Sequence, residues 1–170
     1  MRPKFKLRFP VREIEPYARR YPYGDEAEFL LAETVKRRGF LTREEFLAVC
    51  HWKSPRTQPR CRSNSSEFIR DVTQCALSTS SEQLRIEVLT LLAGVSWPTA
   101  SVMLHFFHRE PYPILDIRAL WSLGCDAPKQ YDFPFWESYT KFCRSLAQKA
   151  GVSMRTLDRA LWQYSKEKQR

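Results

Sequence analysis

The chain has 170 residues, a formal net charge of +9, 43% hydrophobic residues and 14% aromatic residues. This composition indicates an ordered globular protein and excludes a disordered one. No apolar run approaches the roughly 18 residues that a membrane span needs, and the basic N-terminus lacks the apolar stretch of a signal peptide. We therefore expect a cytoplasmic protein with no membrane partner.

Positive charge is concentrated near the N-terminus, where residues 1–20 contain seven Lys and Arg against two Glu. A second basic group consists of Lys53, Arg56, Arg60 and Arg62. Such a balance favours a polyanionic partner, nucleic acid before a membrane surface. Charge that serves solubility alone is the alternative interpretation.

Capping residues and hydrophobic periodicity predict a series of helices with short connections. The residues expected at the helix starts are Gly24 or Asp25, Thr42, Asn64, Thr79, Pro98, Asp116, Pro134 and Ser153. One helix is expected to present Leu84, Val88, Leu91 and Leu92 on a single face, and the next to repeat Ala100, Met103, Leu104 and Phe107 at helical spacing. A loop is expected around residues 53–63.

The sequence therefore predicts one all-α domain over residues 1–170. It consists of a basic segment (1–24), a central core (79–124) and C-terminal helices (134–170). The five cysteines contain no CxxC pair, so we expect neither a zinc ribbon nor an iron–sulfur site.

The segment LLAGVSWPTA, residues 91–100, joins two predicted helices through a short turn. Gly94 stands where a positive φ is expected, and Pro98 suits the first helical turn, where its missing N–H would have had no partner. Backbone N–H groups of such a turn and helix start point outward and can bind phosphate without reading base sequence. An ordinary corner between two helices is the alternative.

Asp116 follows in the segment PILDIRAL, at the start of another predicted helix. A helix N-terminus favours the ionised carboxylate. Such a group can stabilise the positive charge that develops on a sugar when an N-glycosidic bond breaks, and it can orient or deprotonate the attacking water. A simple helix cap is the alternative, and it is compatible with either role.

Taken together, the turn and the carboxylate resemble the helix–hairpin–helix (HhH-GPD) superfamily of DNA glycosylases. The family pattern, L-P-G-V-G-x-K-T-A, is followed about eighteen residues after its lysine by an essential aspartate; here Pro98 stands at the lysine position and Asp116 at the aspartate position. The similarity covers about residues 79–124. It implies a helix–hairpin–helix fold and hydrolysis of a glycosidic bond in double-stranded DNA, with a flipped base and Asp116 as the catalytic group.

The resemblance also implies a DNA-binding hairpin and no organic cofactor. The hairpin residues are Gly94, Val95, Ser96, Trp97 and Thr99. A monovalent cation held by backbone carbonyls of residues 92–97 is a further implication.

Three departures from the family pattern narrow the expected activity. Pro98 replaces the lysine that gives some members a strand-cutting lyase step, so we expect a monofunctional enzyme. Ser96 replaces the second hairpin glycine, and the four-cysteine cluster of some relatives is absent from the sequence. The shortened region before the hairpin suggests an open pocket, which could admit a bulky modified phage base in antiviral defence instead of a damaged base in DNA repair.

A base that leaves the stack needs aromatic or polar surfaces around it, and the strand needs cations. The candidates for the base pocket are Trp52, His105, Tyr112 and Trp121. The candidates for phosphate contacts are Lys53, Arg56, Arg109 and Arg118. Each of these could instead be a core aromatic or a solvated cation, and His105 and His108 lack an evident third ligand for a metal.

Two rival functions remain from the sequence, and we expect a monomer in each case. One is a non-catalytic helix–hairpin–helix DNA-binding protein, which does not need Asp116 to point into a cleft. The other is a helical interaction protein whose charge is incidental; its binding would lack the steep salt dependence of a DNA complex.

Overall fold

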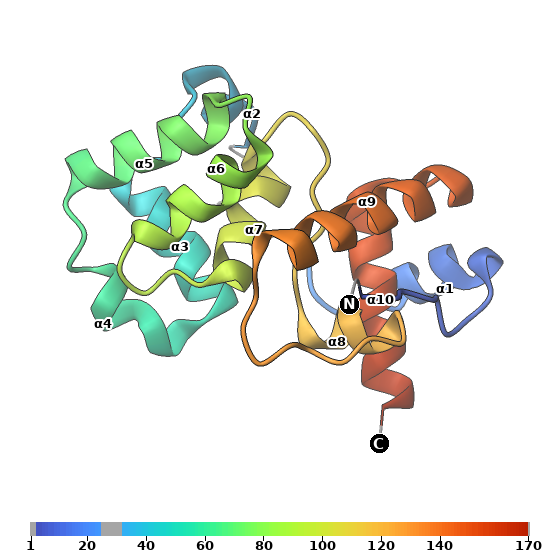
Figure 1. The fold of residues 1–170 in the computed structure, drawn as a ribbon. Coiled ribbons are helices and arrows are strands. Elements are labelled where there is room, and N and C mark those ends of the chain that lie inside the picture. The colour runs from blue at the N-terminus through green and yellow to red at the C-terminus, as the bar shows by residue number, and fades with distance from the viewer. Residues whose placement is uncertain (1–2, 25–31, 170) are drawn as a thin grey trace. The chain divides into compact units, whose positions relative to one another are not determined.

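All regular secondary structure in the described part of the chain is helical, which confirms the predicted all-α class (Figure 1). The structure is a computed structural model that describes residues 3–24 and 32–169. The chain divides into two compact units. We call Gly24–Glu110 the central unit and Met1–Tyr23 with Pro111–Arg170 the terminal unit. The expectation of a single domain stays a prediction.

The central unit is built around α7, whose sides contact α2, α3 and α6. Its helices are α2 (Ala32–Arg38), α3 (Arg43–Lys53), η3 (Pro55–Thr57), α4 (Gln58–Cys61), α5 (Ser66–Ser78), α6 (Glu82–Glu87), η4 (Val88–Leu91) and α7 (Trp97–Phe107). The predicted apolar set on α7 is buried: Ala100, Met103, Leu104 and Phe107 are each at most 2% exposed. The loop predicted around residues 53–63 contains the short helices η3 and α4.

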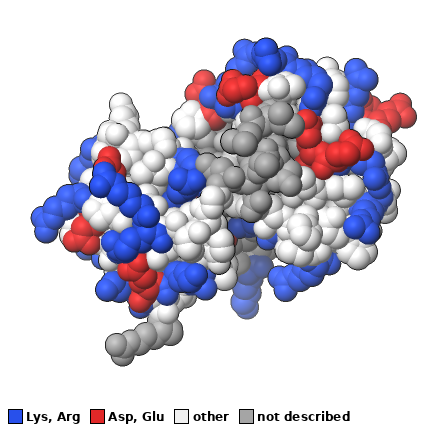
Figure 2. Space-filling view, turned by 180° about the vertical axis from the view of Figure 1, so that it is seen from behind, with Lys and Arg blue, Asp and Glu red and all other residues white. Residues whose placement is uncertain are grey.

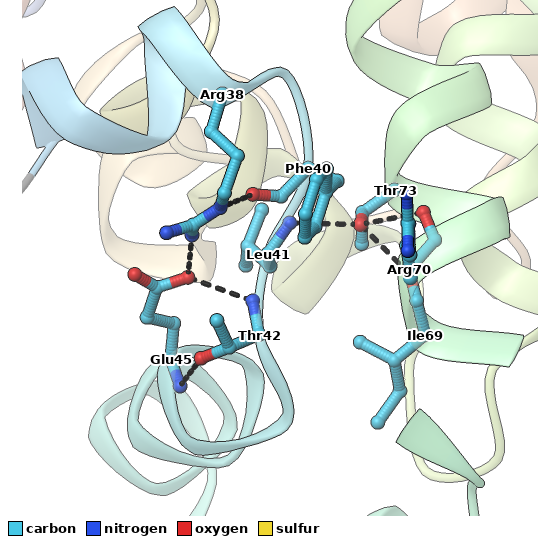
Figure 3. A network of polar contacts seen from close by, with 8 residues as sticks. All are labelled: Arg38, Phe40, Leu41, Thr42, Glu45, Ile69, Arg70 and Thr73. Atoms are coloured by element: carbon cyan, nitrogen blue, oxygen red, sulfur yellow. Dashed lines mark hydrogen bonds and ion pairs between the residues drawn. The ribbon is translucent and has the colours of Figure 1, made fainter. Parts of the chain in front are cut away.

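The connection between α2 and α3 is fixed by polar contacts that local sequence predicts in part (Figure 3). Thr42 and Glu45 form the predicted capping box at the start of α3. The Glu45 carboxylate also pairs with Arg38 at the end of α2. The Leu41 N–H donates to the Thr73 hydroxyl on α5 at 3.0 Å, which ties this connection to the next helix. The helix start predicted at Gly24 or Asp25 stays a prediction, because residues 25–31, where this helix would begin, lie outside the described residues.

Two predicted helix caps were wrong by one or two residues. The cap of α5 is Ser65, whose hydroxyl accepts from the Phe68 N–H, and not Asn64. The cap of α6 is Ser81 and not Thr79. A serine stands at the true start in both cases, and local sequence alone does not decide between neighbouring cap-forming residues.

The apolar face predicted before the turn is observed only in part, since Leu92 is buried but Leu84 and Leu91 are not. The helix changes from α6 to the 3-10 helix η4 at Val88, which breaks the 3.6-residue period. Leu84 and Leu91 are 44% and 64% exposed, whereas Ile86 and Leu89 are buried, so the segment packs through another face.

The terminal unit is built from both ends of the chain around α10, which contacts α1, α8 and α9 (Figure 1). Its helices are η1 (Val11–Glu13), α1 (Ile14–Arg19), α8 (Ile117–Ser122), α9 (Phe133–Ala150) and α10 (Met154–Lys168). Asp116 and Ser153 cap α8 and α10 as predicted. The basic N-terminal segment belongs to this unit, since the N–H groups of Lys6 and Arg8 donate to the carbonyls of Leu123 and Ser122 at 2.8 and 3.0 Å.

Candidate nucleic-acid interface

The segment from Leu92 to Ser96, here called the 92–96 turn, connects η4 to α7 in the central unit. The Val95 N–H donates to the Leu92 carbonyl at 3.0 Å, and Gly94 has φ 84°. These values fit a type II turn, in which the third residue takes a positive φ and is usually glycine. The positive φ predicted at Gly94 is confirmed.

A single buried side chain, which comes from the segment between α4 and α5, binds this turn through hydrogen bonds. Asn64 is 6% exposed. Its Oδ1 accepts the Ala93 N–H at 2.9 Å, and its Nδ2 donates to the carbonyls of Ala93 and Cys61 at 3.0 and 2.8 Å. The amide thus satisfies both backbone groups of a turn residue, which explains why Asn64 does not serve as a helix cap. Sequence analysis missed this role, because the partner lies 29 residues away along the chain.

The same turn packs closely on α4. A Cβ atom added at Gly94 would lie 2.6 Å from the Cys61 sulfur and 3.2 Å from the Arg60 Cβ. Real Cβ contacts are not this short, so glycine is needed here for space as well as for its φ. The contact also brings Arg60 of the second basic group to the turn. Arg56, Arg60 and Arg62 are exposed along η3, α4 and the residue that follows.

The start of α7 follows this turn and has backbone N–H groups that the Ser96 side chain does not cap. Ser96 precedes the helix with extended backbone, and within the described chain its side chain caps none of the first-turn N–H groups. Pro98 lies in this first turn, as predicted, and no acidic residue does. Backbone N–H groups without a capping side chain, at a helix start without an acidic residue, attract an anion such as a phosphate group. Val95 and Thr99 are buried, so they contribute backbone to this surface, whereas Trp97 is half-buried.

Two candidates for the base pocket lie near the later turns of α7. The Trp52 ring on α3 meets the Phe106 ring edge to face at 5.7 Å, and the His105 ring meets the same Phe106 at 4.9 Å. Trp52 and His105 are both half-buried. The structure therefore brings these two together around Phe106, with Lys53 next to Trp52 at the end of α3.

His108 and Arg109 follow α7. The His108 Nδ1 accepts the Glu110 N–H at 2.9 Å, which requires an unprotonated Nδ1. Burial, and after it the charge of Arg85, lowers the pKa of His108. Arg109 is exposed. Among the described residues no group of three His, Cys, Asp or Glu side chains could hold a metal ion.

Asp116 begins α8 in the terminal unit. Its backbone is extended, and Oδ1 accepts the Arg118 N–H at 2.9 Å. The side chain is half-buried. Capping holds the carboxylate in one orientation at a helix N-terminus, where the dipole favours its charged form. The 92–96 turn and Asp116 belong to different units.

Two tyrosines near Asp116 were not predicted from the sequence. Burial first, and then the charge of Asp116, raises the pKa of Tyr131. Burial also raises the pKa of Tyr139, followed by the charges of Cys143, Asp158 and Asp116. Tyr139 is buried and donates to the Ile114 carbonyl at 2.7 Å, so its role is structural. Tyr131 is half-buried in the connection before α9. Its protonated hydroxyl could donate to a water or a substrate near the carboxylate, and no pattern in the segment KQYDFP indicates this.

Tyr112 lies in the core of its unit and has no exposed face. Its ring stacks on Trp136 at 5.6 Å, and the Arg144 guanidinium lies 4.4 Å from its centroid. Trp136 Nε1, Thr140 Oγ1 and Arg144 Nη2 are buried on α9 without a hydrogen-bond partner among the described residues. Direct stacking of a base on Tyr112 would require these side chains to move.

The other two candidates of the terminal unit are Trp121 and Arg118. The Arg8 guanidinium lies 4.5 Å from the centre of the Trp121 ring, and the Tyr164 ring lies 5.8 Å from it. These contacts pack the N-terminal segment against its unit. Arg118 lies over Trp162 of α10 at 5.4 Å. Sequence analysis did not single out Trp162.

Charge does not by itself delimit the interface. Figure 2 shows Lys and Arg side chains spread over the visible face, with Asp and Glu among them. Within the described residues, no helix has the length and apolar character required to cross a membrane. Comparison of the chain with protein-family models, with curated proteins and with solved structures found no match.

Proposed function

We propose that the protein is a monofunctional DNA glycosylase that removes a damaged or modified base from double-stranded DNA and leaves an abasic site. The position of Asp116 supports this proposal most. Its half-buried carboxylate accepts a hydrogen bond from the start of its own helix, and it lies eighteen residues after Pro98. The 92–96 turn, with the uncapped start of α7 and the neighbouring arginines, supports a second part of the proposal. It would hold the phosphate backbone without reading sequence.

In this mechanism the ionised Asp116 stabilises the positive charge that develops on the sugar as the glycosidic bond breaks. The same carboxylate orients the attacking water and takes its proton. The leaving base departs with the bonding electron pair, and water supplies the oxygen at the sugar carbon. Pro98 has no amine, so no Schiff base forms there, the strand stays intact, and borohydride should trap no protein–DNA adduct.

A non-catalytic DNA-binding module is the second candidate. The hydrogen bond from the Arg118 N–H to Asp116 favours it, because capping α8 is a sufficient structural reason for an aspartate. The two functions differ in whether the carboxylate is needed for anything beyond the cap.

Incubation with duplexes that carry alkylated, oxidised or glycosylated bases, followed by mass spectrometry of the released base, tests the proposal. Asp116→Asn retains a cap-forming side chain, and we expect it to slow release by about 10²–10³ and to change DNA affinity by no more than a few-fold. Asp132→Asn is the matched control, since Asp132 caps α9 of the same unit by accepting the Phe135 N–H at 2.9 Å. Equal release by Asp116→Asn and Asp132→Asn would exclude a catalytic Asp116. Duplex binding without release of any base would favour the DNA-binding module.

A further inference from the structure

Three aromatic rings meet on the terminal unit from distant parts of the sequence. Tyr21 and Tyr23 follow α1, and Trp162 lies on α10. Their centroids are 5.3 to 5.6 Å apart in all three pairs, each packed edge to face. Tyr23 is 53% exposed, and Tyr21 and Trp162 are half-buried, so solvent reaches a contiguous aromatic patch. We call these three residues the aromatic triad.

Cations surround the triad. Lys166 Nζ lies 5.0 Å from the Trp162 ring and 5.5 Å from the Tyr23 ring, and the Arg118 guanidinium lies 5.4 Å from Trp162. Arg155 and Arg159 lie over Tyr21 at 5.5 and 5.7 Å. Arg155 is paired with Asp158 at 2.6 Å, so the cations that remain for a ligand here are Lys166 and Arg118, which lie at the Trp162 ring.

The triad is linked to the candidate catalytic carboxylate through one helical turn. Arg118 contributes its side chain to the cation–π contact with Trp162 and its backbone N–H to the carboxylate of Asp116. Both interactions lie within the terminal unit, so their mutual placement is set by the fold of that unit.

We propose that the aromatic triad with Arg118 and Lys166 forms a platform for an unpaired nucleic-acid strand. Base rings stack on Trp162 and Tyr23, while Arg118 and Lys166 lie where they neutralise the flanking phosphates. Exposed aromatic rings interleaved with cations are how proteins hold single strands without reading their sequence. An acidic peptide would use the cations but gain little from three flat rings. The inference rests on the proposed function, because extrusion of a base from a duplex creates the unpaired nucleotides that such a platform would hold.

The test measures affinity for a labelled single-stranded oligothymidine and for an unmodified duplex. We expect Tyr23→Ser and Trp162→Leu each to weaken single-strand binding by roughly 5- to 100-fold, since stacking of one base accounts for an effect of this size. Duplex binding should stay within about three-fold. Lys166→Gln should lower the dependence of single-strand affinity on salt.

Matched controls separate platform effects from general ones. Phe68→Ser removes an aromatic ring that is 42% exposed in the central unit, and Lys141→Gln removes an exposed cation of α9. Both should bind single strands as the wild type does. Tyr23 is exposed, so Tyr23→Ser keeps the test valid even if Trp162→Leu unfolds the terminal unit.

Base release from modified duplexes, measured on the same preparations, separates the two proposals. Single-strand binding that Tyr23→Ser weakens and Phe68→Ser does not supports the platform, whether or not any base is released. Base release by a wild type that does not bind oligothymidine overturns the platform and leaves the glycosylase intact. Equal single-strand affinity of Tyr23→Ser, Trp162→Leu and the wild type likewise overturns the platform.

Discussion

The 92–96 turn and Asp116 are held in place in opposite ways. The turn depends on contacts that are distant in sequence, namely the Asn64 amide and the surface of α4 at Cys61. Asp116 has a local contact, a hydrogen bond from an N–H two residues further along the chain. A surface fixed by distant contacts should fail with the fold, whereas a locally oriented carboxylate should be replaceable with little loss of stability.

The largest effect that this comparison predicts is at Gly94. Gly94→Ala introduces a side chain at positive φ and a contact with Cys61 that is too short. We expect a loss of about 2–5 kcal/mol in the free energy of unfolding from backbone strain and overpacking together. Urea denaturation measures it.

Gly39→Ala provides the control for Gly94→Ala. Gly39 has the same φ of 84°, and a Cβ there would meet nothing within 4 Å. The difference between the two variants isolates the packing contribution. Equal destabilisation by both would mean that α4 yields to the added methyl group and does not fix the turn.

Asn64→Ala should cause the next largest loss of stability. It removes the partner of the Ala93 N–H and of two carbonyls, and unsatisfied groups of this kind cost about 1–3 kcal/mol. Duplex affinity should fall in parallel, because the turn loses its support. Asn64→Asp keeps the acceptor for Ala93 but turns a carboxylate toward the two carbonyls, so it should rescue neither stability nor binding. A rescue by Asn64→Asp would show that the donors of Asn64 are unimportant.

Asp116→Ala should have a smaller effect on stability, about 1 kcal/mol for a lost helix cap, and Asp116→Asn a smaller one still. Thermal or urea unfolding of both variants beside Asp132→Ala checks this expectation. A loss at Asp116 several times that at Asp132 would contradict the view that the carboxylate is held locally.

The smallest effect concerns pH. Burial and the charge of Arg85 lower the pKa of His108 in the folded chain, so below about pH 6.5 the unfolded chain binds the proton more readily. The contribution of His108 to the free energy of unfolding is therefore fully present above that pH, and it is lost as the pH falls. Urea midpoints at pH 7.5 and 5.5 should differ less in His108→Gln than in the wild type. His51 is exposed, so His51→Gln should show the same difference between the two urea midpoints as the wild type.

The features that sequence analysis predicted correctly depend on neighbouring residues. The capping box of Thr42 and Glu45, the caps Asp116 and Ser153, and the positive φ of Gly94 each follow from a few adjacent residues. The candidate site could be outlined for the same reason, because the turn and the carboxylate are local patterns at a fixed spacing.

The failures have a common physical origin in contacts between distant segments. Asn64 has the sequence of a helix cap, and its use as a clamp depends on where Ala93 lies. Leu84 and Leu91 were expected on a buried face, but this segment packs into the core through Ile86 and Leu89 instead. The meeting of Trp162 with Tyr23 and Arg118 joins three segments that no periodicity connects.

The pairing of α1 with α10 has a consequence for synthesis on the ribosome. The central unit occupies one uninterrupted stretch of the chain, whereas the terminal unit combines Met1–Tyr23 with Pro111–Arg170. An uninterrupted unit can fold as soon as it emerges from the ribosome. Translation proceeds at about 5–20 residues per second. Residues 3–23 are made before the rest of their unit, so their apolar residues Phe9, Ile14 and Tyr17 must wait several seconds for α10 before they are buried. During that interval these apolar side chains are exposed to chaperones and to other nascent chains.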